Sequence, residues 1–194
     1  GEDELYGGGY DDHIFGGSKA DYIDGGTGKD IIFGDRDTAN RVVLIAGDAT
    51  GWNPELPIEN LYTIYGDDYI NGGDDDDEIY GDGGSDTLLG GAGKDQILGD
   101  GHEDDIEGKD HGNDFIDGGA GDDTIWGNGG NDIILGGEGK DEINGDANQD
   151  DLAIVWHGND TIDGGAGEDT IWGAGVDDNI KGGARTKVVE SMFN

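Results

Sequence analysis

An aspartate that returns every nine residues constrains this chain more than any other feature of its sequence. It recurs seventeen times, with one long gap and two steps of ten residues. A Leu or Ile stands two residues after every one of these aspartates. The series is Asp3, Asp12, Asp21, Asp30, Asp68, Asp77, Asp86, Asp95, Asp104, Asp114, Asp123, Asp132, Asp141, Asp150, Asp160, Asp169 and Asp178. An acidic low-complexity tail has no reason to keep this apolar partner, so the pattern predicts a folded repeat protein.

Glycines follow the same period, and the unit reads Gly-Gly-x-Gly-x-Asp-x-(Leu/Ile)-x. Clear copies lie at 25–33, 90–98, 118–126, 136–144 and 164–172. The sequence also has a longer period of 46 residues, at which the blocks 66–111, 112–157 and the residues from 158 onward align. Forty-six is five nonapeptides plus one residue, which accounts for the ten-residue steps. We expect the extra residues to bulge the coil without ending it.

The repeat divides the chain into four parts. They are N-terminal repeat units over 1–34, a non-repeat insertion over 35–65, the main repeat region over 66–183 with blocks starting at 66, 112 and 158, and a non-repeat cap or tail over 184–194. The insertion holds both prolines and a short apolar run of strand character. Apolar residues of the tail, such as Val188 and Phe193, are expected to cover the exposed end of the stack.

The composition by itself favours disorder, because 47 Asp and Glu face 10 Lys and Arg and give a net charge of −37. This charge argues against nucleic acid and anionic membrane surfaces as partners. The absence of Cys excludes disulfides and thiolate metal sites. No apolar run is long enough to span a membrane. A folded chain therefore needs multivalent cations to neutralise its acids.

The unit predicts an all-β fold in which short coils stack on one another. The three residues after each Asp suit a short strand whose central Leu or Ile points inward, and the glycine-rich residues suit a tight turn. Two units make one coil of two strands and two turns, and coils stack about 4.8 Å apart. Seventeen units then give roughly eight coils.

The core of such a stack is too thin to hold the fold alone. Burying one Leu or Ile per unit contributes only about 2 kcal/mol, and ordering nine backbone residues costs several times more. Stacking also places the aspartates in one column at each edge, where carboxylates repel one another without a counter-ion. Calcium fits best, because it takes six to eight oxygens from carboxylates and backbone carbonyls. Zinc prefers Cys or His, and magnesium keeps its water shell. Every Asp of the series from Asp12 onward is therefore a candidate ligand for multiple calcium ions.

The unit resembles the RTX, or hemolysin-type calcium-binding, nonapeptide repeat over nearly the whole chain except 35–65 and 184–194. The resemblance implies a right-handed parallel β-roll in which the Asp side chain and backbone carbonyls of the first four unit positions share each ion between turns two units apart. It pairs Asp77 with Asp95, Asp86 with Asp104, Asp123 with Asp141, and Asp132 with Asp150. The site glycines it implies are Gly26, Gly28, Gly73, Gly91, Gly93, Gly119, Gly121, Gly137, Gly139, Gly165 and Gly167. It also implies type I secretion and folding outside the cell in calcium.

Enzyme motifs are not evident. His102-Glu103 begins like a zinc-protease motif, but no second His follows at the required spacing. We therefore expect no enzyme activity in this chain. We expect it to be a calcium-binding structural module of a secreted protein. The alternative is a self-assembling extracellular fibre, surface-layer or adhesin subunit. A third reading places an enzyme or toxin domain elsewhere in a longer parent chain.

The residues that flank each inward Leu or Ile point outward and give the two sheets different faces. One face is expected to carry Thr124/Trp126, Glu142/Asn144 and Thr161/Asp163. The other is expected to carry Gln96/Leu98, Phe115/Asp117, Ile133/Leu135 and Thr170/Trp172, extended by His13/Phe15 and Ile31/Phe33. An apolar stripe of this kind indicates a partner surface, for the insertion, a neighbouring domain or another copy of the chain.

Overall fold

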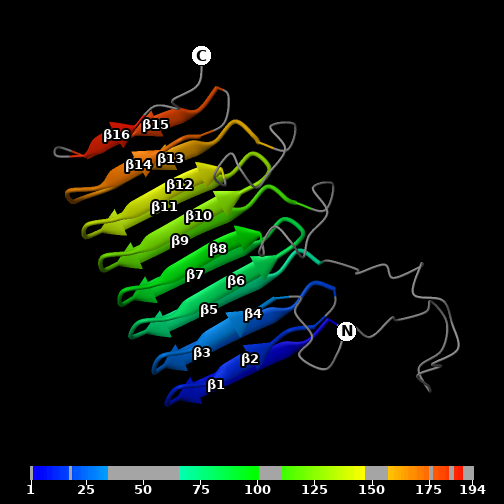
Figure 1. Cartoon of the computed structure of the whole chain (residues 1–194). Coiled ribbons are helices and arrows are strands. Elements are labelled where there is room, and N and C mark those ends of the chain that lie inside the picture. The colour runs from blue at the N-terminus through cyan, green and yellow to red at the C-terminus, as the bar shows by residue number, and fades with distance from the viewer. Residues whose placement is uncertain are drawn as a thin grey trace, which may run out of the picture.

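Two parallel sheets of eight strands each face one another along the whole stack in the computed structural model (Figure 1). The structure describes residues 2–17, 19–34, 66–100, 111–146, 157–174, 177–183 and 186–189. Within these ranges there is no helix, and therefore none that is long and apolar enough to cross a membrane. The all-β fold expected from the nine-residue period, and the parallel β-roll implied by the resemblance, are confirmed.

Successive strands alternate between the two sheets, so that two strands complete one coil. The odd sheet contains β1 (Glu4–Gly9), β3 (Tyr22–Thr27), β5 (Tyr69–Asp74), β7 (Thr87–Ala92), β9 (Phe115–Ala120), β11 (Ile133–Glu138), β13 (Thr161–Asp163) and β15 (Asn179–Lys181). The even sheet contains β2 (His13–Phe15), β4 (Ile31–Phe33), β6 (Glu78–Asp82), β8 (Gln96–Asp100), β10 (Thr124–Asn128), β12 (Glu142–Asp146), β14 (Thr170–Trp172) and β16 (Lys187–Val189).

The core is a double ladder of Ile and Leu between the sheets. Each member stands two residues after an Asp of the series and pairs in register with its counterpart in the next coil, as Ile125 does with Ile143. Twelve of them have no exposed surface: Ile23, Ile32, Ile70, Ile79, Leu88, Ile97, Ile116, Ile125, Ile134, Ile143, Ile162 and Ile171. The core is one side chain wide in each strand, as the sequence predicted.

The register shows where the chain leaves the stack. Partner residues in regular coils lie 18 positions apart, as with Ile79 and Ile97. The spacing grows to 28 where β7 pairs with β9 and where β11 pairs with β13, and to 47 where β3 pairs with β5. The sheets thus pass over ten residues twice, so the expectation of a one-residue bulge in an unbroken coil was wrong.

This register changes the composition of the outer faces. Trp126 and Asn144 follow Leu98 in register on the even sheet, and Trp172 comes next. Phe115, Ile133 and Thr161 are in register on the odd sheet. The predicted separation of the faces was therefore wrong for Thr124/Trp126 and Glu142/Asn144, and for Phe115/Asp117 and Ile133/Leu135. The prediction had counted the units of Asp104 and Asp150 as strands of the stack. Because successive strands alternate between the sheets, each extra unit assigns the strands after it to the opposite sheet.

The C-terminal segment continues the stack. Strand β16 pairs with β14, and Val188 takes the register position opposite Ile171. Three residues of the non-repeat tail thus complete the eighth coil, even though the sheets pass over two of the nonapeptide units.

Candidate metal centre

Two columns of buried aspartates run along the two edges of the roll. The odd column, which precedes the odd strands, contains Asp3, Asp21, Asp68, Asp86, Asp114, Asp132, Asp160 and Asp178. The even column contains Asp12, Asp30, Asp77, Asp95, Asp123, Asp141 and Asp169. Asp95 is fully buried, and most of the others are nearly so. The inward Leu or Ile two positions later orients each of these carboxylates, because it fixes which way the strand faces.

From the second coil onward, one oxygen of each column carboxylate joins successive coils. The backbone N–H of Asp77 donates to Asp95 Oδ1 at 2.8 Å, and that of Asp123 donates to Asp141 Oδ1 at 3.0 Å. The same bond recurs along both columns. The structure therefore brings together these two expected pairs of aspartates.

In the other two expected pairs, the structure gives Asp86 and Asp132 different neighbours in the column. The N–H of Asp86 donates to Asp114 Oδ1 at 2.9 Å, and that of Asp132 donates to Asp160 Oδ1 at 2.9 Å. The register passes over ten residues at these points, so Asp114 and Asp160 take the places that the sequence assigned to Asp104 and Asp150. Those two residues lie outside the described parts of the chain.

The second carboxylate oxygen, Oδ2, is left without a hydrogen-bond donor in most members of the columns. Within the described residues this holds for Asp12, Asp21, Asp30, Asp68, Asp77, Asp95, Asp114, Asp123, Asp132, Asp141 and Asp160. Buried polar atoms are otherwise almost always paired, because an unpaired one has lost its water without compensation. A repeated series of such oxygens is the feature that a bound cation explains.

These oxygens face backbone carbonyls across a space that only glycine leaves open. A Cβ added to Gly90 would lie 2.5 Å from Asp95 Oδ2 and 2.5 Å from the carbonyl oxygen of Gly118 in the next coil. Two acceptors thus converge on one point. Carboxylate and carbonyl oxygens in such a cradle are the donors that Ca²⁺ prefers, so the residues present fit that ion.

The predicted site glycines lie at the ends of the odd strands or just after them, beside the even column. Gly91 has φ +109°, and a Cβ there would lie 2.1 Å from the carbonyl oxygen of Gly73. Stacked turns therefore approach too closely for a side chain. Lys19 and Asp75 replace the glycine at the fourth position of their units and keep positive φ values of 80° and 82°. The turn conformation is thus retained in these two units, with strain that glycine avoids.

Burial raises the pKa of the column carboxyls. It raises the pKa of Asp68, Asp77, Asp123 and Asp160 to about 7, and that of Asp95 and Asp141 to about 6, although the hydrogen bond from the backbone lowers each one. Burial and the charge of Asp114 also raise the pKa of Asp132. Without a cation, ionised carboxylates in these columns are disfavoured at neutral pH.

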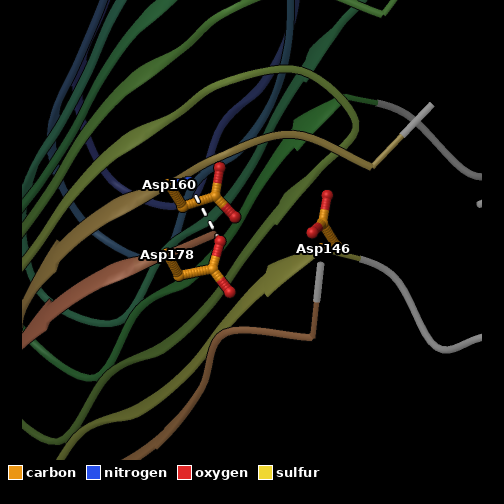
Figure 2. A group of neighbouring side chains, drawn as sticks. All are labelled: Asp146, Asp160 and Asp178. Carbon is orange, nitrogen blue, oxygen red and sulfur yellow. Dashed lines mark hydrogen bonds between the residues drawn. The ribbon is translucent and has the colours of Figure 1, made fainter. Parts of the chain in front are cut away.

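Sequence reasoning missed a further set of buried acids on the odd-column edge. Asp82, Asp100 and Asp146 take the second position of their units, where the consensus has Gly. Asp146 lies with Asp160 and Asp178 in a group whose ligand atoms are all within 4.8 Å of one another (Figure 2). The available signal was the replacement of Gly-Gly by Gly-Asp at the start of these units.

Comparison with known families agrees with this geometry. The family model that matches is described as the RTX calcium-binding nonapeptide repeat (4 copies). Its matches cover residues 6–38, 65–88, 80–110, 111–143 and 158–180, which together make up more than half of the chain. No curated protein matches the chain. RTX nonapeptide repeats bind Ca²⁺, and the matched segments contain almost all of the buried aspartates described above. The chain therefore belongs to the RTX calcium-binding nonapeptide repeat family.

Proposed function

We propose that this chain is the structural, calcium-binding module of a secreted protein, and that it folds into the roll when it meets calcium outside the cell. The observation that carries the proposal is the series of buried Oδ2 atoms that no donor in the described residues reaches. A calcium ion supplies the positively charged partner that these carboxylate oxygens do not find in the protein. Its binding energy is then part of the folding energy, as for other sites that do not exist in the unfolded chain.

Each ion is proposed to lie between turns of successive coils on the same edge. The Asp carboxylates of both columns and the carbonyl groups of the turn glycines are its ligands. Asp95 Oδ2 and the carbonyl of Gly118 exemplify the donor pair. The role of Asp104 and Asp150 as calcium ligands stays a prediction, because these two residues lie outside the described residues.

The proposed place of action follows from the charge. A chain with a net charge of −37 repels itself when no calcium is present, so it stays extended enough for export. Calcium outside the cell then drives folding. Type I secretion is the route that the resemblance to RTX proteins implies, and the appearance of the parent protein in the culture medium, lost when the exporter is deleted, tests it.

Circular dichroism tests the coupling of folding to calcium. The calcium-free chain at neutral pH is expected to lack a β signal, and added calcium should produce one. Magnesium is the control, since it keeps its water shell and should be far less effective. A chain that is already β-rich at neutral pH after complete calcium removal would contradict the proposal.

A second candidate function is a self-assembling extracellular subunit, and the apolar ladder on the even sheet favours it. Phe15, Phe33 and Tyr80 stack with ring centroids 5.0 and 4.7 Å apart, and Leu98, Trp126 and Trp172 occupy later positions of the same row. Sedimentation velocity after calcium addition tests this function. A chain that stays monomeric at all concentrations would count against it.

A further inference from the structure

We propose that Asp146 joins Asp160 and Asp178, the last two members of the odd column, in a three-carboxylate site that binds a hard cation, calcium in the native protein, more tightly than the other column sites do. The proposal rests on the calcium-dependent fold proposed above, and goes beyond it by assigning one site with its own ligand set.

The three carboxylates come from different turns of the odd-column edge. Asp146 is the last residue of β12, while Asp160 and Asp178 precede β13 and β15. Figure 2 shows Asp160 stacked over Asp178, with Asp146 facing both across a shared space. One oxygen of each lies within 4.8 Å of the others, which is the spacing expected for ligands of one ion.

Backbone donors hold one oxygen of each carboxylate and so orient the group. Asp146 Oδ1 accepts the N–H of Gly158 at 3.0 Å. Asp160 Oδ1 accepts the N–H of Asp132 at 2.9 Å, and Asp178 Oδ1 accepts that of Asp160 at 3.1 Å. In the folded roll the backbone thus fixes the three side chains in place, which favours tight binding.

The remaining oxygens indicate a ligand. Asp146 and Asp160 are each 1% exposed, and among the described residues no donor reaches Oδ2 of either one. Two buried anionic oxygens without partners, directed into one space beside a third carboxylate, are unfavourable unless a cation joins them.

The chain contains its own comparison 46 residues earlier. Asp100 corresponds to Asp146, but its Oδ2 is 2.9 Å from Nδ1 of the buried His111 and accepts the N–H of Gly129 at 3.2 Å. A backbone donor and a neighbouring imidazole already surround that oxygen. In the coil between them the equivalent residue is Asn128, which pairs with Asp146 in register and has no charge. Among Asp100, Asn128 and Asp146, the structure therefore points to Asp146 as the one that is open to a cation.

A third carboxylate changes the affinity of the site. A regular column position offers one carboxylate from each turn, whereas this group adds one from the second unit position. Calcium affinity rises with the number of charged ligands. Three carboxylates leave a net charge of −1 around a divalent ion and no net charge around a trivalent ion. A trivalent ion should therefore bind at this site before it binds at the regular sites.

Terbium luminescence on the folded chain tests the inference. The whole chain is kept in enough calcium to saturate its circular dichroism signal, and Tb³⁺ is titrated in with direct excitation of the ion. One Tb³⁺ per chain should bind at a concentration about tenfold or more below that needed for the others. The Asp146→Asn variant should lose this first step. The matched control Asp100→Asn, at the equivalent position, should keep it.

The outcomes separate this inference from the proposed function. A wild-type chain that folds with calcium but binds Tb³⁺ in a single class would overturn the three-carboxylate site, and so would a first step that survives in Asp146→Asn. A chain that does not fold in calcium would instead overturn the proposed function. If Asp146→Asn does not fold, Asp178→Asn should lose the same step, and the wild-type titration by itself can still refute the site.

Discussion

Acid is expected to replace calcium in part as a stabiliser of the roll. The perturbation is complete removal of calcium followed by a change of pH. In the ion-free fold, burial raises the pKa of Asp123 from 3.8 to about 7. A difference of about three pKa units corresponds to about 4 kcal/mol for each ionised carboxylate. Asp68, Asp77 and Asp160 have pKa values raised to about 7 as well. A few such penalties exceed the 5–15 kcal/mol that stabilises a typical domain.

The direction of the pH effect follows from these values. The folded pKa lies above the unfolded one, so the unfolded chain holds fewer protons between about pH 4 and pH 7. The stability of the ion-free roll is therefore fully present below about pH 4 and is lost as the pH rises through about 7. Calcium binding to the folded columns releases the protons that remain, so calcium affinity should rise with pH over the same window.

The assay is circular dichroism of a chain freed of calcium on a chelating resin, because soluble chelators weaken in acid. Sedimentation velocity is run at every pH, since the chain loses its charge near its isoelectric point of about 4.1 and aggregates must be excluded. We expect a β signal from monomers at about pH 4.5 that disappears by about pH 7.5. Calcium added at about pH 6 should release protons in a weakly buffered solution. A β signal that is the same at both pH values, or binding without proton release, would refute the reasoning.

Three further changes probe the core, the turns and the register. Ile125→Ala should lower the free energy of unfolding in urea by about 2–5 kcal/mol at saturating calcium, because Ile125 has no exposed surface. The outward Thr124→Ala is the control, and an equal loss of stability in both variants would contradict an inward ladder. Gly91→Ala should raise the calcium concentration needed for folding, because the residue has φ +109° and a Cβ would lie 2.1 Å from a backbone oxygen. The exposed neighbour change Ala92→Ser should leave that midpoint unchanged. Deletion of 101–110 should preserve the calcium-induced β signal, since it shortens the 28-residue register step between β7 and β9 to the regular 18; loss of folding would show that this segment is part of the coil.

Much of the fold could be predicted from local pattern. Alternation along a strand sends the residue two positions after each Asp inward, so Ile125 and its counterparts were identifiable as core from the period alone. The same period placed Asp77 beside Asp95 in the next coil. Glycine spacing located the turns, because stacked turns such as those of Gly73 and Gly91 leave no room for Cβ atoms.

Register across the ten-residue steps could not be predicted in the same way. Residues 99–107 carry the Asp and the Ile of a regular unit, yet β8 and β10 pair directly and pass over ten residues. Pairing depends on which strand best continues both sheets at once. Asp104 and Asp114 are equivalent by local pattern, and only the position of the neighbouring strand distinguishes them.

The sequence by itself determined the roll, its inward ladder and the need for cations, since these follow from a strict period and a large excess of acid. Only the tertiary structure decided which aspartates are neighbours, which residues share an outer face, and that Asp146 approaches Asp160 and Asp178. The physical reason is that a period describes each turn alone, whereas a metal site is made by oxygens of different turns. Their distances depend on how the coils stack.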